Sequence, residues 1–209
     1  MQKRNKNIKI ILDLLDENYP LTKCYLNYQT DWQLLIATIL SAQCTDDRVN
    51  MVTKDLFRKY KTLKDFASAS QNELEQDIKS TGFYKNKARN IILAANKLLN
   101  DYDSKMPSDI NELIKFPGVG RKTANVIRSH IFNIPSIVVD THVKRISKKL
   151  GFTENNDPEK IEYDLMKIIP QNHWISINLQ LIAHGRKICK ARKPDCTNCF
   201  LNKYCRGAI

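Results

Sequence analysis

Apolar side chains recur at three- and four-residue intervals along nearly the whole chain, and the strict alternation of a half-buried strand is scarce. This periodicity predicts an all-α fold, in which only residues 134–139 are expected to be extended. Helices are expected over residues 8–16, 31–44, 47–60, 70–82, 86–100, 108–115, 121–132, 140–151, 158–170 and 174–187.

Polar residues mark the expected starts of several helices. Ser70 and Glu73 have the spacing of a capping box, and Ser108 is expected to cap the helix that begins there. Residues 31–44 are apolar almost all round, which is typical of a fully buried helix. The first helix is instead amphipathic and places four apolar residues on one face: Ile8, Ile11, Leu12 and Leu15.

The N-terminal residues 2–20 combine a basic start with an apolar segment, as a signal peptide does. Asp13, Asp16 and Glu17 interrupt that segment, and no small-residue cleavage site follows. No apolar run approaches the roughly 20 residues that a transmembrane helix needs. We therefore expect a cytoplasmic protein without a signal peptide or a membrane-spanning segment.

The charge of the chain is strongly positive, since 34 Lys and Arg residues face 22 Asp and Glu residues and give a formal net charge of +12. Such an excess favours a polyanionic partner, with nucleic acid ahead of a membrane. Lysine enrichment that only reflects genome composition gives the same number, so the charge alone leaves the partner open.

The segment FPGVGRKTANVI, residues 116–127, joins two expected helices. Its glycines let the backbone turn sharply and approach another molecule closely, while its phenylalanine and first valine are expected to anchor the turn in the core. A Pro-Gly turn is usually only a turn. Here the next helix begins at the turn beside two cations, which favours phosphate binding that positions DNA without reading its sequence. The expected DNA contacts are Gly118, Val119, Gly120 and Arg121.

Four of the six cysteines fall within 17 residues, spaced C-x6-C-x2-C-x5-C, whereas Cys24 and Cys44 stand alone. In a reducing compartment this clustering favours metal binding over disulfides, and the polar surroundings argue against four unrelated buried cysteines. Four thiolates can hold Zn²⁺ or a [4Fe–4S] cluster, and because only one pair is short, spacing leaves both open. The expected ligands are Cys189, Cys196, Cys199 and Cys205.

Three motifs in this order, PGVGRKTAN, VVDTHVKR and the cysteine quartet, resemble those of the endonuclease III family within the helix-hairpin-helix glycosylase superfamily. The resemblance covers nearly the whole chain. It implies two all-α domains that flank a DNA-binding cleft: a six-helix barrel with the helix-hairpin-helix over residues 24–134, and an iron–sulfur domain made of residues 1–23 and 135–209. It also implies one [4Fe–4S] cluster rather than zinc.

The same resemblance implies a base excision repair enzyme. Such an enzyme is a bifunctional DNA glycosylase and abasic-site lyase that removes oxidised pyrimidines and cuts 3′ to the lesion by β-elimination. The expected partner is double-stranded DNA with damaged bases or abasic sites, bound by a monomer that associates with the nucleoid.

Lys122 begins the second hairpin helix, and Asp140 precedes another helix eighteen residues later. Most lysines in basic proteins are only solvated phosphate contacts, and Asp is a favoured N-cap. A free amine can instead attack the sugar C1′, expel the base and leave a Schiff base. A helix N-terminus and partial desolvation would both lower the lysine pKa from its usual value of about 10.4. The resemblance assigns the two residues as the catalytic pair, in which the carboxylate helps deprotonate the amine and offsets positive charge on the sugar.

A glycosylase must flip its target nucleotide out of the stack, and the resemblance implies that Gln43, after the buried helix, fills the gap. A second wedge is expected from Phe83, where the family commonly has an aliphatic residue. Lys85, Lys87 and Arg89 follow this turn and are either phosphate contacts or a solvated face.

The gap between the first two clustered cysteines is basic. A cluster that rigidifies this loop would present Lys190, Arg192 and Lys193 to the DNA backbone. His142, two residues after the candidate carboxylate, either lines the base pocket or is a structural histidine.

Two other functions fit parts of the pattern. An adenine glycosylase relative shares the hairpin and the cluster but lacks the nucleophilic lysine and has an extra C-terminal domain. Lys122 and the end of the chain at Ile209 argue against it. A non-catalytic DNA-binding module would need neither Lys122 nor Asp140.

Overall fold

The computed structural model describes the backbone of residues 2–20 and 23–207, and the side chains of those ranges from residue 7 onward. These residues form two compact units. One is continuous and covers residues 24–132, here called the 24–132 unit. The other combines the N-terminal segment up to residue 23 with the chain from residue 133 onward, and is here called the two-segment unit.

The described part of the chain contains helices and no strand, so the prediction of an all-α fold is confirmed. None of the helices in that part is long and apolar enough to cross a membrane.

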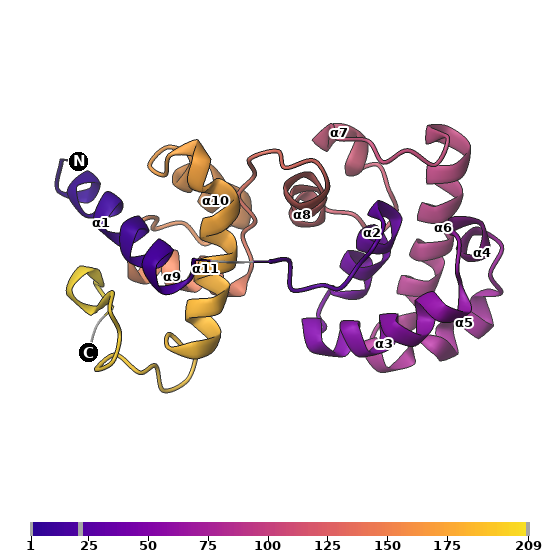
Figure 1. Ribbon diagram of the computed structural model, residues 1–209, viewed down its shortest axis with the longest axis horizontal. Helices are drawn as coiled ribbons and strands as arrows, with labels where there is room; N and C mark the ends of the chain where they lie inside the picture. Colours follow the sequence, from indigo (N-terminus) through magenta and orange to yellow (C-terminus); the bar gives the residue numbers. More distant parts are fainter. Residues whose placement is uncertain (1, 21–22, 208–209) are drawn as a thin grey trace. The chain divides into compact units, whose positions relative to one another are not determined.

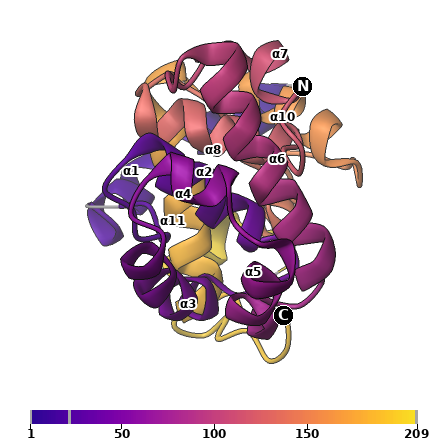
Figure 2. The ribbon, with the colours of Figure 1, turned by 90° about the vertical axis from the view of Figure 1, so that its right-hand side faces the viewer.

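The 24–132 unit is built around a long helix, α6, against which α4 and α5 pack, while α2 lies against both α6 and α8 (Figure 2). Its core is made of leucine, isoleucine, alanine and phenylalanine side chains from all of these helices. The elements are α2 (Asp31–Leu40), α3 (Asp46–Lys59), α4 (Leu63–Ala67), α5 (Gln71–Asp77), the 3-10 turn η1 (Lys79–Thr81), α6 (Tyr84–Tyr102), α7 (Ile110–Leu113) and α8 (Arg121–Ile131).

The buried helix expected over residues 31–44 is α2, but it ends at Leu40. Thr30 starts it with a complete capping box: the Thr30 side chain accepts from the Gln33 amide, and the Gln33 side chain accepts from the Thr30 amide. After Leu40 the backbone turns, because Gln43 adopts a left-handed φ of 52° and the Cys44 amide donates to Ser41 O rather than continuing the helix. The prediction of a helix through residue 44 was therefore wrong at its C-terminal end.

Other helix ends also differ from expectation. The side chain of Ser70 makes no capping bond, and α5 stops at Asp77 before η1 leads to Gly82. Asp109, not Ser108, caps α7, since its carboxylate accepts from two backbone amides of the first turn. The short helix α4 had not been predicted, although Thr62 opens it with a capping box.

The two-segment unit packs α1 (Gln2–Asn18) against α11 (Trp174–Lys187), and α11 against α9 (Thr141–Lys149) (Figure 1). The predicted apolar face of α1 is confirmed: Ile8, Ile11, Leu12 and Leu15 are all buried. The predicted bounds of α11 are confirmed as well. The remaining elements are α10 (Pro158–Met166), which ends four residues before the expected Pro170, and the turns η2 (Gln171–His173) and η3 (Asn202–Tyr204).

Candidate active site and metal centre

The hairpin between α7 and α8 has two buried side chains that anchor it in the core and two exposed glycines, Gly118 and Gly120. Phe116 and Val119 are 2% and 7% exposed and belong to the core of the 24–132 unit, as predicted. Gly118 has a φ of +80° and lies so close to α6 that an added Cβ would stand 3.1 Å from Asn90 Cβ. Gly120 precedes α8 as its N-cap and offers no side-chain acceptor. The hairpin therefore presents exposed backbone at the positive end of a helix dipole.

Lys122 is the second residue of α8, and its side chain is exposed. Asp140 belongs to the two-segment unit, where it is the N-cap of α9 and its Oδ1 accepts from Val143 N at 2.7 Å. The expectation that an Asp in this place caps a helix is therefore confirmed. The cap uses one carboxylate oxygen and leaves Oδ2 for other contacts.

His142 and Arg145 link the first turns of α9 to the cysteine loop. Arg145 Nη2 lies 3.1 Å from His142 Nδ1 and donates to Cys189 O at 2.7 Å. A Cβ on Gly185 of α11 would clash with the same two side chains. Sequence reasoning had not singled out Arg145 or Gly185, although a glycine inside the periodic helix over 174–187 is a signal of close packing.

The four clustered cysteines line one pocket, together with Ile188, Leu201 and the ring of His184. All four thiols are free of disulfides. Burial raises the pKa of the Cys199 thiol, and the charges of the other three thiols raise it further, so the four sulfurs lie within electrostatic reach of one another.

This set of residues fits a [4Fe–4S] cluster. Each of the four irons of such a cluster takes a separate cysteine thiolate, and here four free thiols line one pocket. The rest of the lining includes the apolar side chains of Ile146, Leu150 and Leu201.

His184 forms part of the wall of this pocket. Its Nε2 lies 3.5 Å from Cys199 Sγ, and its Nδ1 lies 3.2 Å from the hydroxyl of Tyr19. Burial lowers the pKa of His184 to about 4. The ring is thus neutral at pH 7 and packs edge-on against Phe200.

The loop after Cys189 is basic and exposed at Lys190, Arg192 and Lys193. Asp195 N closes it by donating to Ile188 O at 3.1 Å, and Lys193 has a left-handed φ of 52°. The cations therefore stand on a short, backbone-bonded loop beside the cysteine pocket.

Gln43 and Phe83 both lie in exposed turns of the 24–132 unit and both have left-handed backbones, with φ of 52° and 49°. Phe83 is 62% exposed, which is unusual for a large apolar side chain. Lys85 and Arg89 are exposed as well.

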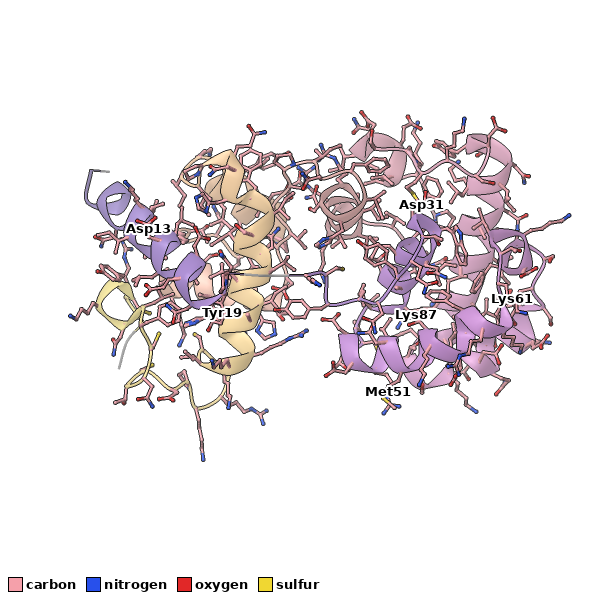
Figure 3. The ribbon with its side chains drawn as sticks, viewed as in Figure 1. Asp13, Tyr19, Asp31, Met51, Lys61 and Lys87 are labelled. Atoms are coloured by element: carbon pink, nitrogen blue, oxygen red, sulfur yellow. The ribbon has the colours of Figure 1, made fainter. Side chains whose placement is uncertain are left out.

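Lys87, which is labelled in Figure 3, differs from its neighbours because it is only 4% exposed. Its ammonium is therefore neither available to a DNA phosphate nor part of a solvated face. Both alternatives for this residue were wrong. Spacing could have indicated this, since Lys87 shares the inward face of α6 with Ile91, Ala95 and Leu98.

Comparisons with known proteins agree with these features. Residues 36–171 match the HhH-GPD superfamily of base excision DNA repair proteins, and residues 189–205 match the iron–sulfur binding domain of endonuclease III. The chain is 48% identical to the endonuclease III of Synechocystis sp. over all of this chain and 95% of that protein. It is 45% identical to the endonuclease III of Bacillus subtilis over 96% and 92% of the two chains.

Among solved structures, the fold matches a trapped endonuclease III–DNA covalent intermediate with a TM-score of 0.92 and 47% identity, over 97% of this chain and 95% of that one. The chain is thus a DNA-binding repair enzyme that joins DNA glycosylase and abasic-site lyase activities and carries a [4Fe–4S] cluster. It belongs to the endonuclease III family of the helix-hairpin-helix base excision repair superfamily.

Proposed function

We propose that Lys122 is the nucleophile of both reactions and that Asp140 is the carboxylate that acts with it. Lys122 carries this proposal, because its amine is exposed on the first turn of α8, at the hairpin that offers backbone amides to a phosphate. A relative with 47% identity has been trapped as a covalent intermediate with DNA, which requires a protein nucleophile.

In this mechanism the neutral Lys122 amine attacks C1′ of the damaged nucleotide, and the C1′–N bond to the base breaks with its electron pair leaving on the base. The departing base takes up a proton. The amine then loses a proton, and the C1′–O4′ bond breaks with its electron pair leaving on O4′, which takes up a proton, so that a Schiff base joins Lys122 to C1′. The C2′ proton is then removed and the 3′ C–O bond breaks, which is β-elimination. Water finally hydrolyses the imine. A carboxylate at Asp140 would accept the amine proton and offset the positive charge that develops on the sugar.

The test for Lys122 is borohydride trapping on a duplex with a thymine glycol. Lys122→Ala should give no trapped adduct. Lys115→Ala is the matched control, since it also removes an exposed cation from the hairpin region, where Lys115 only pairs with Glu112. A trapped adduct from Lys122→Ala at the wild-type rate would show that another group is the nucleophile.

Asp140 needs a variant that separates its cap from its charge. Asp140→Asn keeps an oxygen to accept from the Val143 amide but removes the negative charge. We expect unchanged thermal unfolding and a single-turnover excision rate lower by about 10²-fold or more. Excision at the wild-type rate would leave Asp140 with its capping role alone.

We also propose that Cys189, Cys196, Cys199 and Cys205 are the cluster ligands, because all four line one pocket. Each Cys→Ser change at these positions should reduce the absorption near 400 nm and the iron and sulfide content, whereas Cys24→Ser should change neither. A colourless wild-type protein with one zinc per chain would contradict this assignment. With these ligands, the proposed cluster domain is the two-segment unit. The 24–132 unit is then the proposed six-helix barrel that contains the hairpin.

The proposed DNA contacts are the hairpin backbone at Gly118, Val119 and Gly120 with Arg121, the basic loop, and the turns of Gln43 and Phe83. The side chain of Val119 is buried, so only its backbone would reach a phosphate. His142 is proposed to line the base pocket.

The proposed substrate is duplex DNA with oxidised pyrimidines or abasic sites, bound by a monomer in the cytoplasm. Excision rates on a panel of lesion duplexes would test the substrate, and sedimentation at micromolar concentration would test the monomer. Equal rates on damaged and undamaged bases would contradict the substrate assignment.

A further inference from the structure

Lys87 is a buried cation whose only bonds go to backbone. Its Nζ donates to Leu40 O and to Thr81 O, both at 2.8 Å, and no carboxylate pairs with it in the described part of the chain. Burial lowers its pKa, and a nearby thiol, Cys44, offsets part of that effect. A buried charge without a counter-ion is costly, and an apolar side chain of similar size would commonly serve the core better. The position of the two carbonyls indicates what the ammonium does there.

The two acceptors stand at the bases of two separate turns. Leu40 O is the last carbonyl of α2, and the amide that would bond to it in a continuing helix, Cys44 N, donates to Ser41 O instead. Thr81 O ends η1, just before Gly82. Lys87 supplies the donor at both ends, so one ammonium joins two chain reversals that are about forty residues apart in sequence.

Each of these turns carries one residue in a strained backbone conformation with an exposed side chain. Gln43 follows Leu40 by three residues, and Phe83 follows Thr81 by two. Both have φ near +50°, which residues other than glycine adopt only when the surrounding structure holds them. The two bonds from Lys87 Nζ connect the bases of the two turns.

We propose that Lys87 is a positioning residue that fixes the two turns relative to each other, so that Gln43 and Phe83 enter the duplex together at the flipped nucleotide. This inference rests on the proposed DNA contacts of those two side chains. A wedge that is already ordered before binding saves the entropy of ordering it on the DNA, and two wedges with a fixed spacing can displace a base and separate its partner in one event.

Lys87→Met tests this, because it removes the ammonium and keeps most of the stem. Lys97→Met is the matched control on the same helix, where the Lys97 ammonium pairs with the exposed Asp101 and lies 5.7 Å from the centre of the Tyr102 ring. The substrate is a thymine glycol duplex with 2-aminopurine opposite the lesion, whose fluorescence rises when that base unstacks. We expect Lys87→Met to abolish most of the rise and to slow single-turnover excision by about tenfold or more, whereas Lys97→Met should change neither.

If Lys87 only stabilised the fold, Lys87→Met would slow the reaction equally on every substrate. A second substrate therefore distinguishes a positioning role from a role in stability. A single-stranded oligonucleotide with an abasic site has no stack to open. Lys87→Met should trap on it with borohydride within about twofold of the wild-type rate. An equal loss on the single strand and on the duplex would overturn the proposal.

Double variants test whether Lys87 acts through the wedges. In a Gln43→Ala, Phe83→Ala background, Lys87→Met should cause little further loss of duplex excision. A full additional loss would overturn the positioning role and leave the wedges intact. Wild-type excision by the Gln43→Ala, Phe83→Ala protein would instead refute the proposed DNA contacts.

If Lys87→Met does not fold, Lys87→Gln takes its place in the fluorescence experiment, since the glutamine amide can donate to one of the two carbonyls. We expect an intermediate fluorescence rise from it. A wild-type rise from folded Lys87→Gln would overturn the proposal.

Discussion

The two glycines of the hairpin look alike in the sequence but should respond in opposite ways to an added methyl group. Gly118 has a φ of +80°, and its new Cβ would stand 3.1 Å from Asn90 Cβ and 3.3 Å from Ile39 Cγ2. Asn90 Cβ is fixed to the backbone of α6 and Ile39 is in the core, so neither can yield easily. Gly120 has a φ of −98°, and nothing lies within 4 Å of its Cβ position.

These geometries give a magnitude for Gly118→Ala. The left-handed backbone costs an alanine about 1–2 kcal/mol, and the overpacked Cβ adds about 1–3 kcal/mol. The free energy of unfolding should therefore fall by roughly 2–5 kcal/mol, and the Tm by roughly 4–20 °C. For Gly120→Ala, the weaker N-cap and the stiffer unfolded chain nearly cancel, so we expect a change within about 0.5 kcal/mol.

The assay is urea unfolding followed by circular dichroism at 222 nm, beside fluorescence anisotropy on a duplex with an abasic analogue. Gly120→Ala should keep its stability but bind DNA less tightly, because its methyl group stands where a phosphate would approach. Equal unfolding free energies for the two variants, within about 0.5 kcal/mol, would mean that neither the backbone φ nor the close contacts of Gly118 limit its substitution.

Three further predictions concern other parts of the chain. Gly185→Ala should lower the free energy of unfolding by about 1–3 kcal/mol in urea unfolding, since its Cβ would clash with His142 Nδ1. Burial raises the pKa of Cys24 to about 11, so its alkylation rate, followed by peptide mass spectrometry, should still rise about tenfold per pH unit at pH 10. In urea, where the chain is unfolded, the alkylation rate of Cys24 should stop rising once the pH exceeds the ordinary pKa of a thiol. Lys190→Ala with Lys193→Ala should reduce the slope of log affinity against log salt by up to about 2, and an unchanged slope would exclude both as phosphate contacts.

Helix positions in this chain were predictable where one strong local signal was enough. The bounds of α11 and the buried face of α1 follow from periodicity alone. Cap residues were harder, because Ser108 and Asp109 are adjacent favoured caps and only the backbone geometry decides that Asp109 accepts the bonds. Ser70 has the right spacing for a capping box, yet its side chain makes no such bond.

The candidate site shows the same division between local and long-range signals. Spacing places four cysteines near one another, but their common pocket depends on how the loop folds back on α9 and α11. At the early end of α2, the Leu40 carbonyl accepts from Lys87 Nζ, which is 47 positions away. No periodicity within residues 31–44 could reveal that partner, because the bond joins segments that meet only in the folded chain.

The cysteine loop bonds to α9, the helix that Asp140 caps, at the middle of the helix and at its last residue. Arg145, in the second turn of α9, donates to Cys189 O at 2.7 Å. At the last residue of α9, Lys149 O accepts from Arg206 N at 2.8 Å, one residue after the last clustered cysteine. The loop that would surround the cluster therefore fixes the direction of the helix whose N-cap is the candidate catalytic carboxylate.

Loss of the cluster should accordingly loosen α9 before it loosens the 24–132 unit. In Cys199→Ser, amide hydrogen exchange in peptides covering residues 141–149 should become at least about tenfold faster, because the loop no longer holds the middle and the C-terminal end of the helix. Peptides from α2, α6 and α8 belong to a separate core and should exchange at the wild-type rate. Equal acceleration in both units would mean that the cluster supports the whole fold. Unchanged exchange in α9 would mean that these two hydrogen bonds hold the helix without the metal. Only selective loosening of α9 would connect the cysteine loop to the placement of Asp140.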